Sequence, residues 1–245
     1  MTPLVKRYLS VLAVSILLCA GPALAQSLQD LPFDKQLKLA KVGDVDAQYV
    51  VGLAYETGNR ARKDEAEAAK WYRQAALQGN VESQFHLARL VSRGAKGLKK
   101  DPETAFKLYQ DAAAKGHVEA MNALGQAYQS GTGTPVDLGS AATWYRKAAD
   151  QKLADAENNL GMLYLNGKGV TRDLREAFLL FERAAAQNDP WGLNNVGGMY
   201  EMGWGTPANR NKALEYYRRA AAAGNTQAQQ NFDRLEDKKS AAAPQ

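Results

Sequence analysis

The residues that could perform chemistry are few in this chain of 245 residues. It contains two histidines, His86 and His117, and a single cysteine, Cys19. No H-x-x-x-H pair and no cluster of histidine with cysteine is present, so the sequence predicts no metal site. It also contains no G-x-S-x-G nucleophile elbow and no P-loop. We therefore expect a non-catalytic protein with no catalytic residue and no cofactor.

The charge of the chain does not indicate a nucleic-acid partner. The formal net charge is +5 at pH 7. It becomes +3 if the first 25 residues are removed, because they hold Lys6 and Arg7 and no acidic residue. The remaining basic clusters are scattered along the sequence rather than merged into a stripe, so we interpret them as solvated faces.

Residues 1–25 have the composition of a cleaved secretory signal peptide. Two basic residues precede an apolar stretch at 8–20, and Ala23-Leu24-Ala25 supplies the small-x-small pattern of a cleavage site. The apolar stretch is shorter than the roughly 20 residues of a membrane span. We expect a mature chain that begins at Gln26, has no membrane span, and lies in the periplasm, with secretion as the alternative.

Cys19 raises the alternative of a lipoprotein. A lipid-modified cysteine follows a small residue, but the residue before Cys19 is Leu18. Cleavage after Ala25 is therefore favoured, and it leaves a mature chain without cysteine. Such a chain has no disulfide framework and needs a large core in an oxidising compartment.

One pattern recurs five times in the rest of the chain: two adjacent bulky residues, two further residues and an alanine pair. It occurs as KWYRQAAL, KLYQDAAA, TWYRKAAD, LLFERAAA and EYYRRAAA, starting at 70, 107, 143, 179 and 215. Aligning these segments defines units that begin at Gly43, Gly79, Gly116, Lys152 and Asn188, with a half unit from Gly224. A fixed period of this length is typical of a repeat architecture.

Each unit is predicted to form two helices joined by a glycine-rich turn. Apolar or small residues recur at positions five, nine, twelve and thirteen of the unit, which is the spacing of one buried helical face. The second helix is preceded by a capping residue. These caps are Asp64, Asp101, Asp137, Asp173 and Asn209.

A glycine recurs inside the first helix of four units. These residues are Gly52, Gly125, Gly161 and Gly197, and the second unit has Ala88 instead. A glycine in a helix interior costs about 1 kcal/mol relative to alanine. Its recurrence in one register predicts a close approach at which a side chain would clash.

The pattern A-x-x-x-L-G-x-x-Y-x-x-G, followed by D and A-x-x-W-Y-x-x-A-A, resembles the SEL-one-like repeat (SLR), a relative of the tetratricopeptide repeat. The resemblance covers residues 43–223 and, in part, 224–237. It implies an all-α, right-handed superhelical solenoid of stacked antiparallel helix pairs with a concave face. We expect an N-terminal capping helix within 26–42, repeats over 43–237 and a disordered tail at 238–245.

Positions seven, eleven and fourteen of the first helices point away from the buried face and should line the concave side. We expect them to form a partner-binding groove, with a tolerated polar surface as the alternative. The candidate residues are Tyr49, Leu53, Phe85, Arg89, Asn122, Gln126, Asn158, Met162 and Asn194. A second candidate patch, or alternatively a lid on the last repeat, consists of Trp191, Met202 and Trp204.

The resemblance implies a scaffold that binds another envelope protein or a peptide segment, as an adaptor or regulator of an envelope complex or sensor. The alternative is a peptidoglycan or polysaccharide binding module that uses Trp191 and Trp204 as stacking platforms. A β-lactamase-like hydrolase is less favoured, because the chain lacks an S-x-x-K nucleophile.

Overall fold

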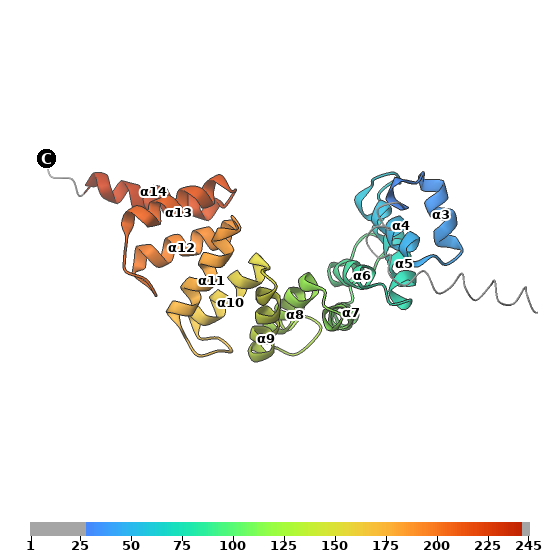
Figure 1. Ribbon diagram of the computed structural model, residues 1–245, viewed down its shortest axis with the longest axis horizontal. Coiled ribbons are helices and arrows are strands. Elements are labelled where there is room, and N and C mark those ends of the chain that lie inside the picture. The colour runs from blue at the N-terminus through green and yellow to red at the C-terminus, as the bar shows by residue number, and fades with distance from the viewer. Residues whose placement is uncertain (1–27, 242–245) are drawn as a thin grey trace, which may run out of the picture. The chain divides into compact units, whose positions relative to one another are not determined.

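The computed structural model describes residues 28–241, with side chains to residue 237, so the predicted signal peptide lies outside the described residues. These residues form α-helices and no β-strand (Figure 1). In chain order the helices are α3 (Phe33–Lys41), α4 (Val45–Thr57), α5 (Glu65–Leu77), α6 (Val81–Arg93), α7 (Pro102–Ala114), α8 (Val118–Ser130), α9 (Leu138–Asp150), α10 (Ala154–Asn166), α11 (Leu174–Ala186), α12 (Pro190–Met202), α13 (Arg210–Ala222) and α14 (Thr226–Ala241).

The helices belong to two compact units, one ending at Lys100 and the other beginning at Asp101. The first contains α3 to α6 and the second contains α7 to α14. Within each unit, every helix packs against the next one along the chain (Figure 1). In the second unit α8, α10, α12 and α14 begin 36 residues apart. The prediction of an all-α solenoid built from stacked helix pairs is therefore confirmed.

The helix boundaries follow from local capping. All five predicted caps of the second helices accept a hydrogen bond from a backbone N–H of the first turn. In α9, for example, Asp137 Oδ1 accepts from the Ser140 N–H at 3.0 Å. These local signals explain why the sequence alone located the repeats.

The glycine inside four of the first helices is required by an aromatic ring of the same repeat. A Cβ atom on Gly125 would lie 2.6 Å from the ring of Tyr145, and one on Gly161 would lie 2.6 Å from the ring of Phe181. Gly52 and Gly197 have the same relation to Tyr72 and Tyr217. The predicted close approach is confirmed in these four repeats, and the second residue of the bulky pair supplies the contact.

The turns between paired helices also approach the neighbouring repeat closely. A Cβ atom on Gly169 would lie 2.2 Å from the carbonyl oxygen of Leu138, at the start of the previous second helix. The φ of Gly169 is +73°, which also disfavours any other residue there. The turn thus ties one helix pair to the next.

Helices close the core at both ends of the described chain. At the first, α3 lies within the segment predicted as a cap, and its Ala40 packs with Val51 and Trp71. At the other, Ala228 and Leu235 of α14 join the core cluster around Tyr217. The backbone of α14 continues to Ala241 and so covers the first four residues of the tail predicted at 238–245, and residues 242–245 lie outside the described part.

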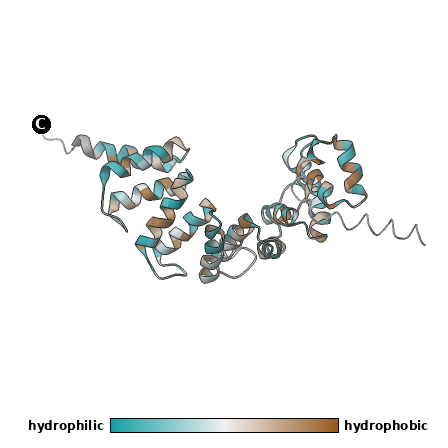
Figure 2. Ribbon diagram, viewed as in Figure 1, coloured by the Kyte–Doolittle hydropathy of each residue, from teal (hydrophilic) through white to brown (hydrophobic). Residues whose placement is uncertain are grey.

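Hydrophilic and hydrophobic residues alternate along the helices, as Figure 2 shows. This alternation matches amphipathic helices that bury one side against their neighbours. Among the described residues, no helix combines the length and the apolar composition that crossing a lipid bilayer requires.

Two adjacent glycines in α12 allow a direct test of the packing argument. A Cβ atom on Gly197 would lie 2.7 Å from the Tyr217 ring, whereas one on Gly198 would meet only the Tyr217 hydroxyl at 3.6 Å. We expect Gly197→Ala to lower the free energy of unfolding by about 1 kcal/mol through overpacking. Gly198→Ala should raise it by about 1 kcal/mol through helix propensity. Chemical denaturation of both variants measures these changes, and equal effects would contradict the packing argument.

Candidate binding surface

The predicted binding residues divide between the two units. Tyr49 and Leu53 lie on α4, and Phe85 and Arg89 lie on α6, all in the first unit. The remaining candidates lie in the second unit, on α8 (Asn122, Gln126), α10 (Asn158, Met162) and α12 (Asn194). Each group is therefore described within its own unit.

In the first unit, the predicted aromatic residues gather around His86. The ring centroids of Tyr49 and Phe85 each lie 5.7 Å from that of His86. The Tyr72 ring is 5.1 Å from the His86 ring. His86 occupies position eight and is not among the predicted binding residues, because helical periodicity does not reveal that neighbouring first helices place positions seven and eight together.

Glu56 is the buried acceptor beneath these rings. The Tyr72 hydroxyl donates to Glu56 Oε2 at 2.7 Å, His86 Nδ1 lies 2.9 Å from the same oxygen, and Arg89 pairs with Oε1. Burial by itself raises the pKa of Glu56, but the hydrogen bonds from His86, Tyr72 and Arg89 outweigh it and lower the pKa to about 2. The guanidinium of Arg89, predicted as a partner contact, thus has an intramolecular partner.

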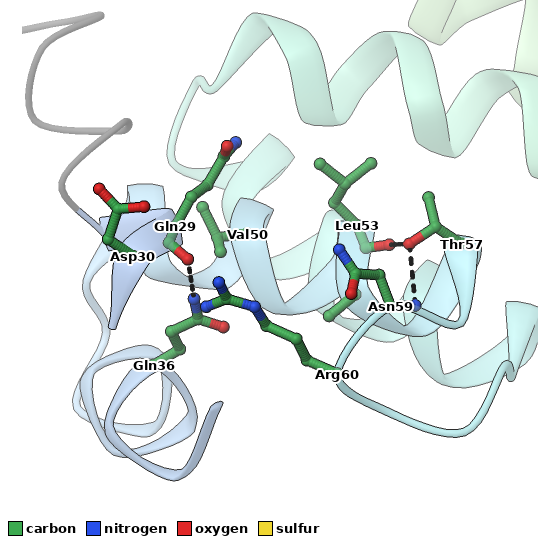
Figure 3. A pocket seen from close by; sticks show the side chains of 9 residues that line it. Gln29, Asp30, Gln36, Val50, Leu53, Thr57, Asn59 and Arg60 are labelled. Carbon is green, nitrogen blue, oxygen red and sulfur yellow. Dashed lines mark hydrogen bonds between the residues drawn. The ribbon is translucent and has the colours of Figure 1, made fainter. Parts of the chain in front are cut away.

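Leu53 lines a different feature of the first unit, a pocket of about 320 Å³ between α3 and the end of α4 (Figure 3). Most of the other residues that line it are polar. The Gln36 amide donates to the Leu28 carbonyl oxygen at 2.8 Å, and the Arg60 guanidinium donates to that of Leu31 at 2.7 Å. The pocket is therefore held together by the backbone of the segment that precedes α3.

In the second unit, the predicted asparagines form a ladder of hydrogen bonds between first helices. Each asparagine at position seven accepts a bond from the asparagine at position eight of the next repeat. The Nδ2 to Oδ1 pairs are Asn159 to Asn122 at 3.1 Å, Asn195 to Asn158 at 2.7 Å, and Asn231 to Asn194 at 3.0 Å. We call this set of six the asparagine ladder.

The ladder uses only one end of each amide. Within the described part of the chain, the Nδ2 atoms of Asn122, Asn158 and Asn194 have no hydrogen-bond partner. Within the same part of the chain, the Oδ1 atoms of Asn159, Asn195 and Asn231 accept no hydrogen bond. Donors and acceptors that are already oriented therefore alternate along α8, α10, α12 and α14.

Position fourteen serves the fold in this unit. Gln129 and Glu201 accept hydrogen bonds from the hydroxyls of Tyr145 and Tyr217, at 2.8 and 2.9 Å. Where the aromatic residue is Phe181, which has no hydroxyl, position fourteen is Leu165. The residue type at position fourteen therefore matches its intramolecular partner, although this position was predicted to line the groove.

Of the second predicted patch, Trp191 lies near the start of α12, whereas Met202 and Trp204 lie at and after its end. Trp191 lies in the first turn of α12 and Met202 is its last residue, so about 16 Å of helix axis separates them. Met202 and Trp204 line a pocket of about 160 Å³ together with Asn194 of the ladder. Trp191 is not among the residues that line this pocket, so the structure brings two of the three predicted residues together there.

No group of histidine, cysteine or acidic residues that could hold a metal ion is present among residues 28–241. The features that the second unit offers to a ligand are thus amide groups and an apolar pocket.

The Glu56 cluster predicts an acid-sensitive contribution to stability. Because its folded pKa lies near 2 and its ordinary value is 4.5, the contribution is complete above pH 4.5 and is lost as the pH falls toward 2. The difference corresponds to about 3 kcal/mol at most. Urea unfolding should find Glu56→Gln less stable than wild type at pH 7 and equal to it near pH 2. The exposed Glu103→Gln is the control, and parallel pH profiles for wild type and Glu56→Gln would contradict the argument.

The Sel1 repeat family model matches residues 45–80, 81–117, 118–153, 154–189 and 192–225. The chain is 30% identical to a protective antigen present in uropathogenic Escherichia coli strains, described as displaying an SLR fold, with a TM-score of 0.78 over 86% of this chain and 45% of that one. It is 32% identical to a Sel1 repeat protein from Oxalobacter formigenes, with a TM-score of 0.73 over 83% of this chain and 58% of that one.

The chain thus spans about half the length of these two structures. A putative Sel1 repeat protein from Klebsiella pneumoniae shares the fold at 23% identity and a TM-score of 0.53, over 84% of this chain and all of that one. A search of curated proteins found no match. Sel1 repeat proteins are generally scaffolds for protein interaction. The five matched repeats and the helix-pair architecture confirm the predicted resemblance, and the chain belongs to the Sel1 repeat family.

Proposed function

We propose that this protein is an exported, non-catalytic scaffold that binds an extended segment of another envelope protein along the asparagine ladder. Membership of the Sel1 repeat family supports a role in protein interaction. The observation that carries the proposal is the row of oriented amide ends on α8, α10, α12 and α14.

The ladder suits a peptide backbone because a backbone offers both N–H donors and carbonyl acceptors. Each amide of the ladder is already held by its neighbour. Binding would therefore immobilise few additional rotamers, and immobilising one side chain at an interface costs about 0.5–1.5 kcal/mol. This preorganisation favours a ligand that makes repeated main-chain hydrogen bonds.

The charge of this face supports a neutral segment. Positions seven, eight and eleven of α8, α10 and α12 hold no charged residue, and position eleven of α14 is Arg234, which pairs with Glu201 at 2.7 Å. Nucleic-acid binding depends on lysine and arginine that neutralise phosphates, so this face is poorly suited to it. An uncharged, extended stretch of protein is the ligand that these side chains favour.

A pair of isosteric substitutions tests the ladder as a binding surface. Asn158→Asp with Asn194→Asp keeps the Oδ1 acceptors of the ladder but replaces the two free donors with oxygen. Two lost contacts of about 1–3 kcal/mol each should reduce partner capture by tenfold or more. Photo-cross-linking in living cells, with captured protein quantified by mass spectrometry, measures the change.

The matched control carries the same charge change on exposed asparagines outside the ladder, Asn188→Asp with Asn211→Asp. It should capture the partner as the wild type does. Equal capture by the ladder variant would contradict the proposed surface. Retention of the wild type on cell-wall material without any captured protein would favour the polysaccharide alternative instead.

The proposed export predicts the N-terminal residue of the mature protein. If residues 1–25 are a signal peptide, the protein purified from the periplasm of the host bacterium should begin at Gln26. Mass spectrometry of the intact chain identifies this end. A chain that begins at Met1 and fractionates with the cytoplasm would contradict the envelope location while leaving the ladder experiment unaffected.

A further inference from the structure

The apolar pocket at the end of the asparagine ladder has features of a site for one side chain of the partner. Its inner side is formed by buried residues, among them Phe181, Met199 and Tyr217. Its rim carries Met202 and Trp204, which are 57% and 37% exposed. Large apolar side chains at the mouth of a pocket leave apolar surface in water that a ligand would cover.

Gly198 lines this pocket, and its lack of a side chain leaves the pocket open. Nothing in the packing of the fold requires glycine at this position. Gly198 lies inside α12, where glycine is less favourable than alanine by about fivefold in helix formation. A Cβ atom there would meet only the Tyr217 hydroxyl, at an ordinary contact distance of 3.6 Å. The adjacent Gly197 is explained by the Tyr217 ring, but the packing of the fold does not require Gly198.

The preceding repeat indicates what a larger residue would do at this position. Its position eleven is Met162, whose Sδ lies 3.9 Å from Nδ2 of Asn195 on the next first helix. A methionine in place of Gly198 should reach Asn231 in the same way and occupy the pocket, because Asn231 is the next ladder residue and lines it.

The size and polarity of the pocket select the occupant. Its volume of about 160 Å³ is close to that of an engineered apolar cavity of about 150 Å³ that binds benzene. It is smaller than the roughly 300 Å³ at which sites for small molecules begin. None of its lining residues is charged. One leucine or phenylalanine side chain fits this description.

Three lining residues belong to the ladder and could hold the backbone beside that side chain. Asn194 has its Nδ2 donor free, and Asn195 and Asn231 have their Oδ1 acceptors free within the described residues. A backbone donor and acceptor beside the inserted side chain could pair with them. The pocket and the ladder thus form one continuous surface.

We propose that the pocket at Gly198 binds a single leucine or phenylalanine side chain of the extended partner segment and so sets its register on the ladder. This inference rests on the proposed function, since the ladder holds the backbone. A larger residue at Gly198 should therefore stabilise the protein and weaken binding. If the glycine were needed only for packing, the same substitution would destabilise the protein instead.

The test is selection of random linear peptides displayed on phage against the purified chain 26–245, with the Gly198→Met protein in solution as competitor. Selected peptides should share one leucine or phenylalanine. In calorimetry, a synthetic peptide of the selected sequence should bind Gly198→Met about 10- to 100-fold more weakly than wild type. The melting temperature of this variant should rise by about 2 °C.

Leu179→Met is the control, because it introduces the same side chain at an exposed position of α11 that belongs to neither the ladder nor the pocket. It should bind the peptide as the wild type does. Trp204→Ala, in the turn after α12, removes part of the rim and should also weaken binding. Changing the shared leucine or phenylalanine of the peptide to aspartate should abolish it.

Peptides that lack a common apolar residue, or that bind Gly198→Met and wild type equally, would overturn the pocket. If those peptides still lose affinity for the Asn158→Asp, Asn194→Asp variant, the ladder function stands without the pocket. If the wild type selects no peptide, the side-chain site is also overturned, and the cross-linking experiment alone decides the proposed function.

Discussion

The contact on which this structure depends is that between a glycine of the first helix and an aromatic ring of the second helix in the same repeat. A Cβ atom in place of Gly125 or Gly161 would lie only 2.6 Å from the ring of Tyr145 or Phe181, which leaves no room for any residue other than glycine. This contact sets how closely the two helices approach. It also directs the ring edge toward position fourteen, so that a hydroxyl reaches Gln129 or Glu201 where one is present. A helix pair built in this way repeats with a constant geometry, and the alanine pairs of the second helices are buried or partly buried.

Constant geometry brings residues 37 positions apart into regular contact. The asparagine ladder is the direct consequence, because positions seven and eight of successive first helices meet three times in the second unit. In each amide, one of the two polar atoms makes the ladder hydrogen bond and stabilises the fold. This bond also fixes the direction of the other polar atom, which therefore needs no further partner to orient it. Stability and recognition are therefore provided by the same side chains, and removing an asparagine outright would disturb both. Substitution by aspartate separates them, because the ladder acceptor is kept.

Departures from the repeat mark the places where the fold alone does not explain a residue. In the first unit, His86 occupies position eight, and it joins Tyr72 and Arg89 around the buried Glu56. In the second unit, Gly198 replaces the larger residue of the preceding repeat and leaves an apolar pocket. The first departure is stabilising above the pKa of Glu56. The second lowers helix stability, and a cost of this kind in a regular array is more readily explained by a ligand than by packing.

The sequence by itself determined the period, the two helices of each repeat, their caps and the family. These properties depend on residues that are close along the chain, such as Asp137 and Ser140, or on a pattern that recurs in one register. It also located the faces that carry Asn158 and Asn194. Only the tertiary structure decided which groups on those faces remain free. Arg89 pairs with Glu56, whereas each ladder asparagine keeps one end of its amide without a partner. The tertiary structure also decided that Trp191 lies about 16 Å of helix axis from Met202. The reason is that contacts between residues 33 to 37 apart depend on how helices pack, and helical periodicity specifies the direction of a side chain but not the neighbour that it meets.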